Sequence, residues 1–447
     1  MCAMASYLPE SQIITLSNDI LAFHDPENPI GFTNPIQFGV FFHEWIHYLH
    51  NVSTISGLSL FSIQVTLWSN FRWTMNEDKL SGGSQELSEE HIINNKNMFT
   101  YIRHGRINNN AMIPSNIQPD NVEIIFFELL EKEIKNDQVT KPSTIKCDMT
   151  WNGKIFTLYI GILEMLESAA YMLESKLVST MGETPISARF SPYHLVSTLA
   201  SKIAPSLSNE DIICCIITAL QYNDPPELLL SILKDLESQP VDERQLFLKS
   251  HAKKLLQIQE DAVDETIRKI REMFPVHEPM GDVVKLTLDR IENNISFRKT
   301  DPFIELSIID ITSKEICQID EFIIQFGGCT IIQERHGEDD QIERDIMYDL
   351  NNNDFDDFKS FGWKMMRAAF HFTMLHFDQH GKIKSTKELP ESKYRKCPFY
   401  TSCNYKQRHD SGHICAQTPW ETIKNNDCKC YYAAAVKATN PPPNSLE

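Results

Sequence analysis

Residues 34–51 read NPIQFGVFFHEWIHYLHN, and this stretch decides the fold expected for the chain. It predicts a helix with a well-defined beginning. Asn34 can cap the first turn, Pro35 suits the first helical position, and Gln37 can reach back as in a capping box. Phe, Trp, Ile and Leu side chains flank its polar positions. A helix of this composition is expected to lie buried beneath a cleft.

The segment His43-Glu44-Trp45-Ile46-His47 lies inside this helix and combines side chains that metal hydrolases use. Two histidines four residues apart share one helical face, so both imidazoles can bind a single metal ion. Glu44 lies about 100° around the helix from His43, where it can act on a water at the metal. The same composition in random order would form the pattern about 0.04 times per chain, so chance is a weak explanation. The alternative is a pair of core histidines beside a surface glutamate.

At these residues the chain resembles the zincin metallopeptidases, and it is most similar to their glutamate-zincin type. The resemblance implies a catalytic zinc on His43 and His47, with Glu44 as the general base on zinc-bound water. The metzincin extension is absent, because its glycine and histidine positions hold His50 and Ser53. A third ligand must therefore come from another part of the chain. His50 is expected in the core or beside the ligands, without binding the metal.

In the glutamate-zincins the third ligand is a glutamate on a later helix, which points to residues 161–176, GILEMLESAAYMLESK. The polar side chains of this predicted helix fall on one stripe: Glu164, Glu167, Ser168, Tyr171 and Glu174. Glu167 is the predicted zinc ligand, because the small residues 168–170 allow two helices to approach closely. Glu164 is expected to orient a histidine through its ring N–H, and Glu174 is expected to be dispensable for the metal. Alternatively, these glutamates pair with Lys or Arg elsewhere.

Two stretches with alternating apolar and polar residues precede that helix, at 143–151 and 154–160. The dipeptide Asn152-Gly153 joins them and favours the tight turn that matches the twist of β-strands. The pattern predicts a β-hairpin that runs directly into the helix. In the zincins an edge strand near the metal holds extended substrate, so the resemblance makes strand 154–160 a candidate for this role.

Residues 396–430 are rich in cysteine and histidine, where even spacing along the chain would place about one cysteine. The members of the cluster are Cys397, Cys403, His409, His413, Cys415, Cys428 and Cys430. Thiolates and imidazoles in a reducing compartment favour a structural, four-coordinate zinc, with the five cysteines as candidate ligands. Their spacings match no standard zinc finger. Disulfides or a plain thiol-rich core are the main alternative, and an iron–sulfur cluster is a further one.

The whole chain has 447 residues and a formal net charge of −19, which argues against nucleic acid and an anionic membrane as partners. No stretch approaches the roughly 18 apolar residues of a membrane span, and the first residues do not resemble a secretory signal. Eleven cysteines, an odd count, fit a reducing cytosol better than a disulfide framework. The expected location is therefore cytoplasmic.

The predicted fold class is α+β and predominantly α-helical. Helical patterns cover most of residues 192–294, and a long amphipathic helix is expected at 355–377. We expect three regions: a zincin-like catalytic region at 1–190, a mainly helical region at 191–390, and a Cys/His-rich end with a flexible tail at 391–447.

The predicted function is zinc-dependent hydrolysis of peptide bonds in a cytosolic protein, with one catalytic zinc and a second, structural zinc at the cysteines. Expected partners are a protein or peptide substrate and a regulatory protein. Tyr171, His50 and His409 are candidates for stabilising the oxyanion. Two alternatives stay open. One is a zinc hydrolase of a non-peptide amide or ester, and the other is a catalytically inactive module whose helical region, 190–300, docks a partner.

Overall fold

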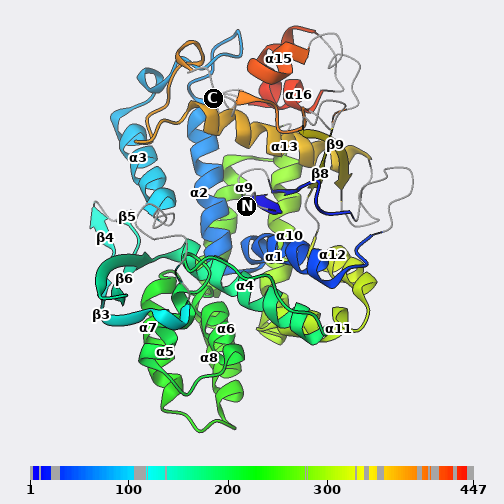
Figure 1. Cartoon of the computed structure of the whole chain (residues 1–447). Helices are drawn as coiled ribbons and strands as arrows, with labels where there is room; N and C mark the ends of the chain where they lie inside the picture. The colour runs from blue at the N-terminus through cyan, green and yellow to red at the C-terminus, as the bar shows by residue number, and fades with distance from the viewer. Residues whose placement is uncertain are drawn as a thin grey trace.

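A computed structural model describes most of the chain, which consists mainly of long helices with small sheets at their sides (Figure 1). The described residues are 4–9, 12–21, 31–104, 117, 119–135, 138–276, 278, 280–327, 330–336, 342–349, 357–389, 395–400, 403, 412–425 and 430–439. Helix far exceeds strand in this part of the chain, which confirms the prediction of a predominantly helical α+β protein. None of its helices combines the length and the apolar character that a membrane crossing requires.

The helices follow one another along most of the chain. The α-helices are α1 (Pro35–Ser53), α2 (Ile55–Arg72), α3 (Glu89–His104), α4 (Ile162–Thr180), α5 (Leu195–Ile203), α6 (Asn209–Ala219), α7 (Pro225–Glu237), α8 (Arg244–Ile258), α9 (Glu260–Met273), α10 (Gly281–Thr300), α11 (Ile304–Thr312), α12 (Ile319–Phe326), α13 (Asp357–His376), α15 (Gly412–Gln417) and α16 (Tyr431–Ala438). Short 3-10 helices lie at Ser84–Glu86, Pro119–Asn121, Ile316–Gln318, Thr386–Glu388 and Pro419–Asn425. The mainly helical prediction for 192–294 is therefore confirmed, and α13 confirms the helix predicted at 355–377 over residues 357–376.

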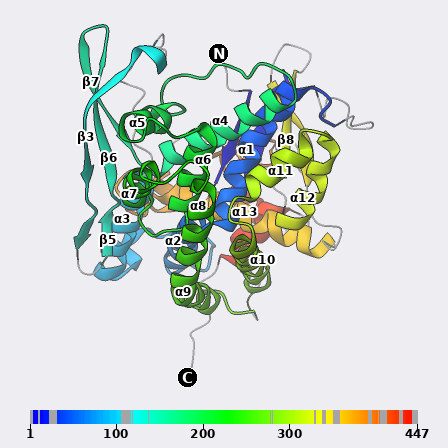
Figure 2. The same cartoon turned by 90° about the horizontal axis from the view of Figure 1, so that it is seen from below.

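The strands form two main sheets and one short ladder. The first sheet has the order β1 (Ala5–Leu8), β2 (Ile13–Leu16), β8 (Thr330–His336) and β9 (Ile342–Asp349). The second has the order β3 (Glu123–Leu130), β6 (Thr144–Trp151) and β7 (Lys154–Ile160), and the ladder pairs β4 (Glu133–Lys135) with β5 (Gln138–Lys141). Figure 2 shows the three-stranded sheet on one side of the helices and β8 on the other.

The four-stranded sheet joins the beginning of the chain to a segment more than 300 residues later. β2 runs parallel to β8 with Ile13 opposite Thr330, whereas the β1–β2 and β8–β9 pairs are antiparallel. Its apolar side chains, such as Ile14 and Ile331, are fully buried. Among the described strands, β1 pairs with β2 alone and therefore forms one edge of the sheet. The division into three regions stays a prediction.

The predicted hairpin is confirmed as β6 and β7. Asn152 and Gly153 both have positive φ angles, 50° and 73°, as the tight turn between twisted strands requires. β7 leads directly into α4, the helix that carries the predicted third ligand.

The motif-bearing helix α1 begins as predicted. The Asn34 side chain accepts hydrogen bonds from the backbone N–H groups of Ile36 at 2.8 Å and of Gln37 at 3.2 Å. These bonds satisfy amide groups that have no partner inside the helix. The expected capping box is wrong, because the Gln37 side chain bonds the backbone of Asp19 and Leu21. Gln37 therefore links the start of α1 to the segment that follows β2.

α1 and α4 lie side by side in the interior (Figure 2). The apolar flanks of the motif, such as Phe42 and Trp45, are fully buried, as expected. A Cβ atom at Gly39 would lie 2.5 Å from Val178 Cγ2, so a larger residue here would force α1, α4 or the Val178 side chain to shift. The small residues 168–170 of α4 are also fully buried. The two helices can therefore bring polar side chains into contact.

Candidate metal centre

Three side chains from α1 and α4 meet beside a cavity. Glu167 Oε2 lies 3.4 Å from His43 Nε2 and 3.5 Å from His47 Nε2. The candidate ligand atoms of the three residues all lie within 4.8 Å of one another. Within the described residues, this is the one group of three His, Cys, Asp or Glu side chains with that spacing. The structure thus brings together the three predicted zinc ligands, and the group could hold a metal ion.

The spacing of these atoms fits zinc. Two imidazoles and one carboxylate form a ligand set that catalytic zinc sites use. Bonds of about 2.0–2.2 Å at tetrahedral angles place neighbouring ligand atoms about 3.3–3.6 Å apart. The separations of Glu167 Oε2 from the two ring nitrogens, 3.4 Å and 3.5 Å, fall in this range. The contact between His43 Nε2 and Glu167 Oε2 is also within hydrogen-bond range, so the spacing is compatible with direct pairing of the side chains and with a shared cation.

Glu174 contacts His43, the first of the predicted ligands. His43 Nδ1 lies 3.0 Å from Glu174 Oε2, so the ring can donate its Nδ1–H to the carboxylate and keep its Nε2 lone pair for a metal. The sequence analysis assigned this role to Glu164, and that prediction is wrong. The carboxylate of Glu164 accepts the backbone N–H of Gly161 at 2.9 Å and caps its own helix.

Burial and charge shift the pKa values of the site. Burial alone lowers the pKa of His43, but its hydrogen bonds to Glu167 and Glu174 outweigh burial and raise the pKa to about 10. Burial raises the pKa of Glu44, although His43 and His47 act in the opposite sense. For Glu167, burial acts to raise the pKa, but His47 and His43 outweigh it and hold the pKa below its usual range. A histidine that holds a proton so firmly among three carboxylates indicates a site that attracts positive charge.

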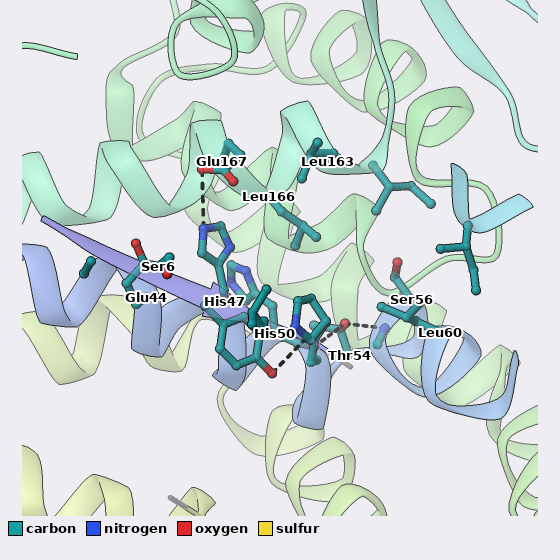
Figure 3. A pocket seen from close by; sticks show the side chains of 18 of the residues that line it. Ser6, Glu44, His47, His50, Thr54, Ser56, Leu60, Leu163, Leu166 and Glu167 are labelled. Carbon is teal, nitrogen blue, oxygen red and sulfur yellow. Dashed lines mark hydrogen bonds and ion pairs between the residues drawn. The ribbon is translucent and has the colours of Figure 1, made fainter. Parts of the chain in front are cut away.

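The metal centre borders a cavity of about 460 Å³, within the usual size range of small-ligand sites. Glu44, His47 and Glu167 line it together with apolar side chains from three helices. These side chains are Leu60, Ile102, Ile162, Leu163 and Leu166. Figure 3 shows the Glu167 carboxylate pointing toward the His47 ring, with Leu163 and Leu166 on the same side of the cavity as Glu167. A ligand in this cavity would therefore lie next to Glu44, His47 and Glu167.

One wall of the cavity is formed by β1. All four of its residues line the cavity, together with Pro9. No residue of β7 lines this cavity, so the candidate strand 154–160 does not have the position expected of a substrate-binding edge. β7 lies at the edge of the other sheet. Tyr7 of β1 stacks near His47 with ring centroids 6.4 Å apart, and its hydroxyl accepts a hydrogen bond from Asn51 at 3.1 Å.

Tyr193 was missed by the sequence analysis. It lines the cavity, and its ring contacts the His43 ring edge-on with centroids 5.8 Å apart. Burial, and then the charge of Glu167, raise the pKa of its hydroxyl well above the usual range. Tyr171, one of the predicted oxyanion donors, instead donates to the Ile186 carbonyl oxygen at 3.2 Å. No motif marks Tyr193, which follows Pro192 in a loop between α4 and α5.

His50 is a neighbour of the ligands, as expected, and is not one of the three-residue metal group. It is fully buried on α1, and its Nε2 lies 3.0 Å from Glu305 Oε1. It also lines the cavity. The other predicted oxyanion donor, His409, lies outside the described residues.

The cysteine-rich end is only partly described. Cys428, His409 and the side chain of His413 lie outside the described residues. Burial raises the pKa of Cys397 well above its usual range, and the nearby thiols of Cys403, Cys415 and Cys430 add to this shift. Within the described residues these cysteines do not form a group with three ligand atoms inside 4.8 Å. A structural zinc on the five cysteines therefore stays a prediction.

Comparisons of the chain with protein-family models, with curated proteins and with solved structures gave no match. The resemblance to the zincins therefore rests on residues of α1 and α4. A function has to be inferred from the arrangement of His43, Glu44, His47 and Glu167 around the cavity.

Proposed function

We propose that this protein is a zinc-dependent peptidase with a zincin-like catalytic core. The observation that carries the proposal is the position of Glu167, whose Oε2 lies 3.4 Å and 3.5 Å from the ring nitrogens of His43 and His47. Glu44 follows the first ligand and lines the same cavity. Two imidazoles, a carboxylate and an adjacent general base are the groups that zinc hydrolases use.

Each residue of the site has a role in this reaction. His43, His47 and Glu167 would hold the zinc, and Glu174 would orient His43. A bound zinc supplies Lewis acidity, which makes water more acidic and a carbonyl more electrophilic. Glu44 takes a proton from the attacking water and gives it to the leaving amine. Because burial raises the pKa of Glu44, its carboxylate accepts and returns this proton more readily near neutral pH.

Tyr193 is the residue that we assign to the oxyanion. Its hydroxyl keeps its proton at neutral pH, because burial and the charge of Glu167 raise its pKa. It lines the cavity beside Glu44 and Glu167, where the carbonyl oxygen of a substrate would gain negative charge. A hydrogen-bond donor already in position stabilises that charge without reorganisation.

β1 favours a peptide over a small amide or ester as the substrate. It forms one wall of the cavity and, among the described strands, pairs only with β2. An edge strand of this kind can bind an extended peptide by backbone hydrogen bonds. A zinc hydrolase of a small non-peptide amide or ester is the alternative, and it would make no use of this edge.

The cytoplasmic location belongs to the same proposal. Cys147, Cys214 and Cys215 are buried free thiols, which fits a reducing compartment. The substrate would then be a cytosolic protein, and a regulatory protein partner remains part of the proposal.

Mapping of cleavage sites across a proteome tests this function. Zinc-loaded wild-type protein is compared with the Glu44→Gln variant at equal zinc content. We expect defined peptide bonds to be cut by the wild type and spared by the variant. Bound zinc with hydrolysis of small amides or esters only would favour the non-peptide hydrolase. A protein that binds no zinc would favour the interaction module.

A further inference from the structure

The cavity beside the metal centre has a second half that lies away from the proposed metal ligands. Figure 3 shows Leu60 of α2 on the opposite side of the cavity from Glu44. Leu163 and Leu166 of α4 lie between the two. A ligand with one group beside Glu44 can therefore extend another group along these leucines toward α2.

The side chains of this apolar half are open to a ligand. The half is formed by the five apolar lining residues of α2, α3 and α4, which are Leu60, Ile102, Ile162, Leu163 and Leu166. All five are half-buried, so each keeps accessible surface although many apolar residues of the same helices are fully buried. Because they line the cavity and keep this surface, a group inside the cavity can contact them directly.

The apolar half offers no charge to a ligand. Among the described lining residues, Glu44 and Glu167 are the acidic ones, both lie at the metal centre, and none is Lys or Arg. Burial raises the pKa of Tyr101, which lines the cavity from α3, to about 12, so its hydroxyl is neutral at physiological pH. Transfer of a charged or unpaired polar side chain from water into such a site is unfavourable, whereas transfer of an apolar one is favourable.

We propose that the apolar half of the cavity binds a large apolar side chain of the substrate, such as leucine or phenylalanine, next to the scissile bond. The inference rests on the proposed peptidase function and names the class of residue at which the chain is cut. The scissile carbonyl would lie beside Glu44 and Glu167, and the adjoining side chain extends toward Leu60. Leu60 is therefore a specificity residue, because it limits the length of the side chain that fits.

Neutral amino-acid amides test the inference without any turnover. The probes are N-acetyl-leucinamide, N-acetyl-alaninamide and N-acetyl-asparaginamide, and their dissociation constants are measured by ligand-observed NMR on Glu44→Gln protein with zinc added. We expect the leucine amide to bind about 10-fold or more tighter than the alanine amide, because it buries three more carbon atoms. Asparagine resembles leucine in shape but would leave its amide group unpaired, so it should bind no better than alanine. Equal affinities of the leucine and asparagine amides, or no binding of any probe, would overturn the inference.

Substitutions at Leu60 test its role at the end of the cavity. In the Glu44→Gln background, Leu60→Ala should shift the preference from the leucine amide to N-acetyl-tryptophanamide. Leu60→Trp fills the same space and should remove the preference for leucine over alanine. Ile63→Ala is the matched control, since Ile63 is a half-buried apolar residue of α2 that is not among the lining residues, and it should leave the order of affinities unchanged. The parental order of affinities in both Leu60 variants would overturn the inference.

Cleavage of matched peptides then links the apolar half of the cavity to catalysis. Peptides that differ only by leucine or asparagine beside the scissile bond should differ about 10-fold or more in kcat/KM for the wild type. A leucine preference in amide binding without any peptide cleavage would contradict the proposed function and leave the apolar site standing. Cleavage with equal kcat/KM for both peptides would contradict the apolar site alone.

Discussion

His43 Nδ1 lies 3.0 Å from Glu174 Oε2, so the His43 ring is held through the nitrogen that does not face Glu167. The carboxylate fixes the tautomer in which Nε2 is free to bind a metal. Glu174 lies about two helical turns after Glu167 on α4, and from there it orients the His43 side chain of α1. It makes the metal centre depend on the packing of both helices.

Glu174→Ala should lower zinc affinity by about 10- to 100-fold, the usual effect of removing a carboxylate that orients a metal-binding histidine. The reason is that His43 loses both its fixed tautomer and its fixed ring angle. Competition with a zinc chelator measures the change. The exposed Glu183→Gln variant of the following loop is the control and should leave affinity unchanged. Wild-type affinity in Glu174→Ala would show that the contact does not support the site.

Gly39→Ala should destabilise the fold, because the new methyl group would lie 2.5 Å from Val178 Cγ2 and 3.4 Å from Glu174 Cγ. Overpacking of this kind costs about 1–3 kcal/mol of unfolding free energy. Urea denaturation measures the loss. Adding Val178→Ala removes the nearest atom and should recover part of the stability. An additive effect of the two substitutions would contradict a direct contact between them.

Zinc binding should release about one proton at neutral pH, because the pKa of His43 is raised from 6.5 to about 10. In metal-free protein this proton stabilises the fold fully below pH 6.5, and the contribution is lost as the pH rises through about 10. Zinc affinity should therefore rise about 10-fold per pH unit between about pH 7 and pH 9. Calorimetry in buffers of different ionisation enthalpy counts the protons. Affinity independent of pH would contradict the raised pKa.

Arg298→Met should lower the free energy of unfolding by about 3–5 kcal/mol, because it leaves the fully buried Glu305 without its cation. Arg268 is a matched surface control, since it pairs with Glu265 and Glu272 where all three side chains are exposed. Arg268→Met should change stability by less than about 1 kcal/mol. Thermal and urea unfolding of both variants give the comparison. Equal losses would show that the buried Arg298–Glu305 pair contributes no more to stability than the exposed pairs of Arg268.

Local patterns were enough to predict the parts of the fold that depend on neighbours in the chain. Asn34 and Pro35 mark the start of α1, and Asn152-Gly153 marks the turn between β6 and β7. The two histidines of the motif and Glu167 also follow from helical spacing, once the resemblance to the zincins supplies the third ligand. These features need no knowledge of tertiary packing.

The remaining features of the site depend on contacts between distant segments. Glu164 and Glu174 lie on the same polar stripe of α4, and the pattern alone does not show which of them meets His43. β1 is a four-residue strand whose place beside the cavity follows from the parallel pairing of β2 with β8. Tyr193 lies in a loop, where no periodic pattern reports the direction of a side chain.

The central claim is that His43, His47 and Glu167 hold a zinc ion on which peptide hydrolysis by Glu44 depends. The most direct test measures bound zinc and the rate of peptide hydrolysis in the same preparations of wild type, Glu44→Gln and Glu167→Ala. We predict that Glu44→Gln keeps its zinc and loses about 100-fold or more of the rate, since a positioned base contributes about 10²- to 10⁴-fold. Glu167→Ala should lose both the metal and the activity. A zinc-loaded Glu44→Gln protein that still hydrolyses peptides at the wild-type rate would contradict the account.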